Sequence, residues 1–111
     1  MERVITQRAA ILARCSTEAN VCSQILTLKQ FAKDKYIIGD EDVFGDNISG
    51  SSSITERPEL AKLMNHIENG TKHYDVVLVQ DTSRIGKTPE QVQKLVDWFM
   101  SKNVRVEFLD S

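Results

Sequence analysis

The chain has 111 residues, 41% hydrophobic and 27% charged, which is the balance of one globular domain. Its net charge of −2 argues against a self-sufficient nucleic-acid-binding protein, because such proteins usually carry an excess of positive charge. No apolar run is long enough to span a membrane, and the first residues lack the apolar core of a signal peptide, so we expect a cytoplasmic protein.

The first half of the chain predicts a strand, a helix and a second strand. Residues 9–14, AAILAR, have the continuous apolar character of a buried strand. Residues 18–34 repeat apolar side chains on one helical face, and Thr17 is suited to cap that helix. Residues 36–44 predict the second strand. Residues 45–56 are rich in Gly and Ser without periodicity, which predicts a long loop of a kind that is usually functional or mobile.

The second half predicts two more helices and two more strands. Pro58 opens a helix whose apolar residues repeat at helical spacing, and Gly70 is suited to end it. Residues 75–80, DVVLVQ, contain a continuous apolar run, which predicts a strand covered on both faces. Thr88 is followed by Pro and, three residues later, by Gln, which indicates a capped helix. Residues 104–109 alternate, as expected of an edge or half-exposed strand.

Strands and helices thus alternate along the whole chain. This order predicts an α/β fold of three layers, with a central, mostly parallel sheet of four to five strands and helices on both faces. In such sheets, ligands bind outside the carboxyl ends of the strands. The residues that follow the first three predicted strands are therefore the candidates for a functional site.

Those strand ends carry hydroxyls, carboxylates and cations. Arg14 and Ser16 follow the first strand, and Asp46 follows the second. The segment after the third strand contains Asp81, Ser83, Arg84 and Lys87. Arg57, at the start of the second helix, can join them. Arginines and a lysine around a serine indicate phosphate chemistry, because a hydroxyl that attacks a phosphodiester develops negative charge which guanidinium groups bind in pairs.

The histidines and cysteines give weaker indications of a functional site. The sequence shows no metal-ligand spacing, and neither His66 nor His73 is placed to act as a base for Ser16. Cys15 and Cys22 have no CxxC spacing, which indicates two reduced thiols.

Each candidate also has a plainer interpretation. Ser16 can simply cap the first helix, Arg14 can be a surface charge, and 45–56 can be a solvated linker. The GKT at 86–88 is not a phosphate-binding loop, because such a loop requires glycine where Asp81 stands. From the residues alone these alternatives remain open.

Three segments together resemble one protein family. ARCSTE (13–18) is similar to the A-R-V-S-T signature of serine recombinases, the resolvase and invertase group with its larger relatives. FGDNISGSSSITERPEL (44–60) resembles their D-x-x-S-G segment and the helix start after it. VVLVQDTSRIGKT (76–88) resembles their strand leading into D-R-L-x-R. The order and spacing of the three segments match the family pattern from about residue 8 onward. The residues of the second and third segments are more similar to those of the large recombinases of phages and mobile elements.

The resemblance implies a DNA recombinase that cleaves and rejoins strands through a 5′-phosphoserine link, with Ser16 as the nucleophile. Its other implied site residues are three arginines that bind the scissile phosphate, an aspartate that orients them and an active-site glutamine: Arg14, Arg57, Arg84, Asp46 and Gln24. The implied partner is double-stranded DNA, bound by a homodimer or homotetramer, with no cofactor and no metal. Residues 1–111 would be the catalytic domain, with the subunit-pairing helix and the DNA-binding domain outside them.

The sequence departs from the family pattern at a few positions. Ser83 stands where the family commonly has aspartate, and Asp81 is a candidate to replace it. Lys87 stands where the family has its last arginine, which keeps the charge but loses the planar fork. Leu12 replaces a frequent aromatic residue. These departures leave a rival interpretation: a non-catalytic α/β module that binds phosphate or a protein, or a decayed recombinase.

Overall fold

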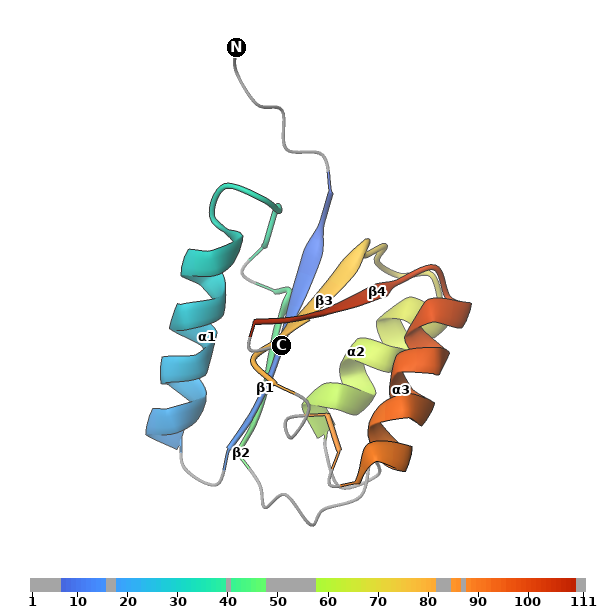
Figure 1. The fold of residues 1–111 in the computed structure, drawn as a ribbon. Helices are drawn as coiled ribbons and strands as arrows, with labels where there is room; N and C mark the ends of the chain where they lie inside the picture. The colour runs from blue at the N-terminus through green and yellow to red at the C-terminus, as the bar shows by residue number, and fades with distance from the viewer. Residues whose placement is uncertain are drawn as a thin grey trace.

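The computed structural model of the chain describes residues 7–15, 18–39, 41–47, 58–81, 85–86 and 88–109. Strands and helices alternate through the described residues (Figure 1). In chain order they are β1 (Ala9–Cys15), α1 (Glu18–Ala32), β2 (Val43–Asn47), α2 (Pro58–Glu68), β3 (Val76–Val79), α3 (Pro89–Ser101) and β4 (Arg105–Phe108).

The four strands form one parallel sheet in the order β2-β1-β3-β4. β1 and β3 are the inner strands, and the side chains of Ala9–Ala13 and Val76–Val79 are all buried. Both runs are continuously apolar because helices cover both faces of an inner parallel strand. β4 lies at an edge and is more exposed, as its alternation predicts.

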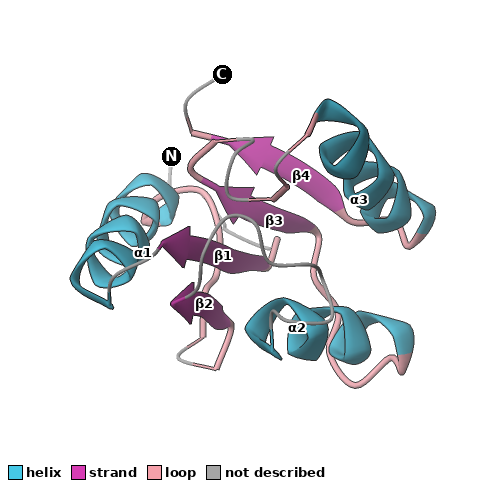
Figure 2. Cartoon of the chain, turned by 90° about the horizontal axis from the view of Figure 1, so that it is seen from below, coloured by secondary structure: helices cyan, strands magenta, loops and turns pink. Residues whose placement is uncertain are grey.

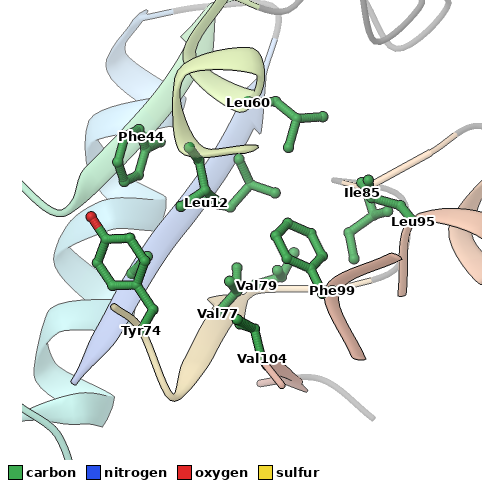
Figure 3. Close-up of a cluster of buried hydrophobic side chains, with 12 residues drawn as sticks. Leu12, Phe44, Leu60, Tyr74, Val77, Val79, Ile85, Leu95, Phe99 and Val104 are labelled. Atoms are coloured by element: carbon green, nitrogen blue, oxygen red, sulfur yellow. The ribbon is translucent and has the colours of Figure 1, made fainter. Parts of the chain in front are cut away.

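The helices divide between the two faces: α1 covers one, while α2 and α3 cover the other (Figure 2). Successive side chains of a strand point to opposite faces. Ala10 and Leu12 therefore pack with α2 and α3 in the larger core cluster, and Ile11 packs with α1 in the smaller one. Figure 3 shows the larger cluster, where Leu60 from α2 and Phe99 from α3 meet the sheet. The predicted three-layer α/β fold with a parallel sheet is confirmed.

The prediction of the second strand was wrong in its position. The prediction was a strand at 36–44, but β2 spans Val43–Asn47 and so includes the first residues of the predicted 45–56 loop. Among the described residues of 36–42, only Ile37 forms an isolated bridge, to Arg8. The remainder of the predicted loop lies outside the described residues.

The cause is a turn around Asp42. Its backbone N–H donates to the Gly39 carbonyl at 3.0 Å, and its carboxylate accepts from the Gly39 N–H at 3.0 Å. The same carboxylate accepts hydrogen bonds from Arg8 (2.9 Å), Lys72 (3.2 Å) and the Tyr74 hydroxyl (2.8 Å). Asp42 is fully buried, so a charged residue lies inside a segment whose apolar residues favour a strand. These contacts join the amino ends of β1, β2 and β3.

The remaining boundaries agree closely with the sequence. α1 ends at Ala32, two residues before its predicted end. Thr88 caps α3 as predicted, since its hydroxyl accepts from the Gln91 N–H at 3.2 Å. Gly70 has φ of 68° after α2, and the Thr71 N–H bonds the His66 carbonyl at 3.0 Å, the arrangement of a Schellman motif. The predicted cap Thr17 lies outside the described residues. No described helix is long and apolar enough to cross a bilayer.

Candidate active site

Two of the predicted site residues lie side by side at the carboxyl edge of the sheet. The parallel pairing of β1 with β2 sets Arg14 opposite Asp46, one residue before each strand ends. Arg14 is half-buried and Asp46 is 2% exposed. The register of one strand pair therefore brings a guanidinium-bearing residue and a buried carboxylate together where α/β sheets bind their ligands.

The Asp46 carboxylate binds the first turn of α2. Oδ1 accepts from the Glu59 N–H at 2.9 Å, and Oδ2 accepts from the Leu60 N–H at 3.2 Å. A helix N-terminus leaves its first amides without intrahelical partners and carries partial positive charge, so a buried carboxylate is stable there. Asp46 thereby connects the end of β2 to the helix that begins at Pro58, directly after Arg57 in the sequence.

Gln24 on α1 holds the main chain of Arg14. Its carboxamide Nε2 donates to the Arg14 carbonyl at 3.0 Å, and its Oε1 accepts from the Arg14 N–H at 3.4 Å. The Ile11 N–H bonds the Asp42 carbonyl on the β2 side of β1, so the backbone groups of Arg14, three residues on, point to the other side. β3 pairs with β1 over Ala9–Ile11. The buried amide of Gln24 occupies the position that a longer neighbouring strand would occupy.

The structure thus brings together Arg14, Gln24 and Asp46 of the predicted site. Asp81 follows β3, the strand beside β1, and is half-buried at the same edge of the sheet. The other predicted site residues lie outside the described residues: Ser16, Arg57, Ser83, Arg84 and Lys87.

The histidines lie elsewhere. His73 precedes β3 and its Nε2 is 3.2 Å from Asp75 Oδ1, so it lies at the amino edge of the sheet, as predicted. The His66 ring, in the last turn of α2, packs 6.1 Å from the ring of Phe44. Over the ranges that the structure describes, no three His, Cys, Asp or Glu residues gather in a way that could hold a metal ion.

Sequence reasoning missed two features that support the site. The amides of Glu59 and Leu60 were not recognised as partners of Asp46. An indication was available, because the residue before Pro58 is an arginine, which has no acceptor to cap a helix. The buried Asp42 was also missed, and its indication was the run of acidic residues inside an apparently strand-like segment.

Comparison with known proteins identifies the family. The family model described as "Resolvase, N terminal domain" matches residues 9–111. The chain belongs to this family. The resemblance to serine recombinases is therefore confirmed, and the match includes every predicted site residue from Arg14 to Lys87.

Individual relatives agree with this assignment. The Tn2501 transposon resolvase of Escherichia coli is 31% identical over 74 residues, which is 67% of this chain and 36% of that protein. The chain thus spans about a third of that resolvase. Among solved structures, the C-terminal catalytic domain of ISC1926 TnpA, described as an IS607-like serine recombinase, superposes with a TM-score of 0.78 at 28% identity. That superposition covers 94% of this chain and 70% of the other.

A second structure supports the fold alone. The first open reading frame of transposon ISC1904 from Sulfolobus solfataricus P2 has a TM-score of 0.71 at 18% identity, and the match covers 96% of this chain and 69% of that one. Both solved structures therefore share the three-layer arrangement of this chain.

Proposed function

We propose that this chain is the catalytic domain of a site-specific DNA recombinase that uses Ser16 as its nucleophile. The supporting observation is that a chain of the resolvase family sets Arg14, Gln24 and Asp46 together at the carboxyl edge of the sheet, beside the strand end that leads into Ser16. Arg14 and Ser16 are two residues apart in the chain. This short spacing suits two groups that act on one phosphate, because such groups must be close together.

The proposed step is a transesterification. The Ser16 oxygen attacks the phosphorus of a DNA phosphodiester and forms a new P–O bond, while the bond from phosphorus to the 3′ oxygen breaks. The 3′ oxygen takes a proton and leaves as a free hydroxyl, and the 5′ phosphate stays on the serine. Rejoining is the same exchange in reverse with a 3′ hydroxyl from another strand. One phosphate ester replaces another, so the step itself consumes no high-energy nucleotide.

Cations supply most of the acceleration in this proposal. Arg14, Arg57 and Arg84 bind the non-bridging oxygens, and Lys87 adds charge near the leaving group. Groups that are placed in advance around developing negative charge stabilise the transition state, typically by about 3–4 kcal/mol for each donor. Asp46 and Gln24 orient these cations. Asp81, with Ser83, is proposed to serve where the family has its aspartate.

The proposed partner is double-stranded DNA, and the proposed active form is a homodimer or homotetramer that acts in the cytoplasm without a metal. The residues that pair the subunits and recognise the site are proposed to lie outside 1–111. Two observations support this arrangement: the net charge is −2, and the matched region is 36% of the Tn2501 resolvase. Binding of DNA rests largely on neutralising phosphates, which a chain of this charge does weakly by itself.

The test is a search for the covalent protein–DNA link. The full-length protein is incubated with labelled DNA carrying a candidate site, separated on a denaturing gel, and the modified peptide is mapped. We expect an adduct on Ser16 that is absent from the Ser16→Ala variant. Ser23→Ala, at an exposed serine on α1, is the matched control and should form the adduct normally. An adduct on another residue, or one undiminished in Ser16→Ala, would overturn the mechanism.

A further inference from the structure

A tyrosine after α1 joins the end of that helix to the edge strand β4. The Tyr36 ring packs in the smaller core cluster, which also contains Val76 and Leu78 of β3. Its hydroxyl donates to Glu107 Oε2 at 2.5 Å and accepts from Arg105 Nη2 at 2.8 Å. Both partners belong to β4, which lies at the opposite edge of the sheet from β2.

The hydroxyl is the main link between the two charged side chains of β4. Arg105 and Glu107 are the register partners of Val76 and Leu78, so their side chains lie on the face that α1 covers. Arg105 Nη2 and Glu107 Oε2 are 3.9 Å apart, whereas each lies within 2.8 Å of the Tyr36 hydroxyl oxygen. Hydrogen bonds to charged groups are stronger than those between neutral groups. Loss of this hydroxyl would therefore detach the end of α1 from β4.

The apolar contact between α1 and the sheet is made largely by small side chains. α1 is the one described helix on its face (Figure 2), and it packs over β1 and β2. Its buried apolar side chains, where the structure describes them, are Leu28 and Ala32, with Ile25 and Phe31 partly buried. The sheet contributes the equally small Ala9 to the same cluster. Small side chains form shallow ridges, which resist sliding less than interdigitated large ones. Hydrogen bonds near the two ends of α1 are therefore important for its position on the sheet.

The second of these attachments is Gln24, which binds the main chain of Arg14. Its two bonds are 3.0 and 3.4 Å long. An N–H···O bond is usually about 2.7–3.2 Å long, and at about 3.6 Å it no longer counts as a bond. A displacement of α1 by a few tenths of an ångström is therefore enough to break the longer one. The Tyr36 N–H donates to the Ala32 carbonyl at 2.9 Å, so Tyr36 moves with the end of the helix.

We propose that Tyr36 is a positioning residue: its hydroxyl fixes α1 to Glu107 and Arg105 of β4, so that Gln24 holds the main chain of Arg14. The edge strand is thereby coupled to the carboxyl end of β1, although β3 separates the two strands. The coupling stands on the contacts of these described residues, and its effect on DNA cleavage rests on the proposed function.

NMR spectra of Tyr36→Phe test the coupling, because this variant loses the hydroxyl and keeps the ring that packs with β3. We expect the Arg14 main-chain signal and the Gln24 side-chain amide signal to shift. The Arg14 N–H should exchange with solvent roughly fivefold faster, which corresponds to the net contribution of one hydrogen bond. Glu107→Ala removes the same link from the β4 side and should shift both signals in the same direction. Unchanged signals in Tyr36→Phe would overturn the proposal.

A matched control removes a hydroxyl from the end of another helix. The Ser101 hydroxyl, in the last turn of α3, donates to the Trp98 carbonyl at 2.6 Å. Ser101→Ala should leave the Arg14 and Gln24 signals unchanged and should cleave DNA at the wild-type rate. Equal shifts in Ser101→Ala and Tyr36→Phe would show a general response to destabilisation, which contradicts a specific role for Tyr36.

Cleavage by the full-length protein tests whether Tyr36 acts through Gln24. We expect Tyr36→Phe to slow adduct formation by up to about tenfold, less than the roughly 100-fold that a misplacement of 1 Å can cause. The double variant Tyr36→Phe, Gln24→Ala should match Gln24→Ala within about twofold, because both substitutions disturb one contact. If the two losses multiply, or if Tyr36→Phe cleaves at the wild-type rate, Tyr36 is not a positioning residue.

The glutamate partner offers a conservative variant. Glu107→Gln keeps an acceptor for the Tyr36 hydroxyl, so it should cleave faster than Glu107→Ala, and equal losses in both would contradict the proposal. Failure of the proposed function is distinguishable from failure here. If the wild type forms no Ser16 adduct, that function is wrong, while the Arg14 and Gln24 signals still decide whether Tyr36 holds α1 in position.

Discussion

The main chain of Arg14 is held by a side chain rather than by a strand. Gln24 makes a donor and an acceptor bond to it, at 3.0 and 3.4 Å, where the pairing of β3 with β1 does not extend. The amide is buried, so its loss leaves polar backbone groups away from water, at a cost of about 1–3 kcal/mol for each such group. A glutamine that is expected to belong to the site thus acts on the backbone that leads to Ser16.

We predict that Gln24→Ala lowers both stability and cleavage. The free energy of unfolding should fall by about 1–3 kcal/mol, and adduct formation should slow by up to about 100-fold as the Arg14 backbone shifts. Gln24→Glu should be more damaging than alanine, because it buries a charged carboxylate oxygen against the Arg14 carbonyl oxygen, whereas alanine only leaves that carbonyl without its donor. Urea titration and single-turnover cleavage measure the two effects. The matched control is Gln30→Ala, an exposed glutamine on the same helix, and equal losses in both variants would contradict a specific role for Gln24.

At the scale of elements, β2 is the strand on which the site most depends. It is a five-residue edge strand with the sequence VFGDN, in which only Phe44 adds a large core side chain. Such a strand has a weakly determined register, and a slip by one residue would turn its side chains to the opposite face. The contacts of Asp42, at the amino end of β2, compensate for this weakness. They join it to Arg8 before β1 and to Tyr74 before β3.

We therefore predict that Asp42→Ala destabilises the domain and disturbs the site four residues further along the chain. The buried Tyr74 hydroxyl loses its partner, which costs about 1–3 kcal/mol in the free energy of unfolding. The amide signals of Glu59 and Leu60, which report the Asp46 contacts, should shift in NMR spectra. Glu41→Ala is the control: its side chain is 84% exposed and bonds only Lys72 among the described residues, so it should change neither. Unshifted Glu59 and Leu60 signals in Asp42→Ala would show that Asp42 does not set the register of β2.

At the scale of the whole molecule, the two edges of the sheet have different tasks. The carboxyl edge carries the proposed chemistry, and the amino edge carries carboxylates that hold the strands together. Burial alone raises the pKa of Asp42, but hydrogen bonds from Tyr74, Arg8, Gly39 and Lys72 outweigh it and hold that pKa below its usual value. The Arg8 N–H, with a smaller contribution from His73, likewise lowers the pKa of Asp75.

These pKa shifts predict acid sensitivity. A carboxyl group whose pKa is lower in the folded state stabilises the fold above its unfolded pKa, which is about 4, and this contribution is lost as the pH falls through the folded value. The free energy of unfolding should therefore be steady near neutral pH and fall below about pH 4. The fluorescence of Trp98, the single tryptophan, can follow unfolding in urea at each pH.

Two variants assign this acid dependence. Asp42→Asn should be less stable at neutral pH and lose less stability between about pH 4 and about pH 2. Tyr74→Phe removes one hydrogen bond that lowers the Asp42 pKa, so its loss of stability should begin at higher pH than in the wild type. An acid dependence that is the same in all three proteins would assign the effect to other groups.

The sequence by itself determined the fold class, the inner strands and the family. The apolar runs within 9–14 and 75–80 favour buried parallel strands over other secondary structures. Thr88 marks the start of one helix and Gly70 the end of another, each through local backbone chemistry. These features are decided by neighbours in the chain. The motif containing Arg14 and Ser16 and the two later segments were sufficient for the family because their order and spacing are linear properties.

The tertiary structure alone decided where β2 lies and what holds the site. Residues 36–44 have an apolar pattern that favours a strand, but the carboxylate of Asp42 binds groups that precede β1 and β3. No local sequence pattern reveals partners so distant along the chain. The same is true of Asp46, whose amide partners belong to a helix more than ten residues away. Charges and hydrogen bonds between distant segments depend on the packed arrangement, so a single sequence shows the residues but not their pairing.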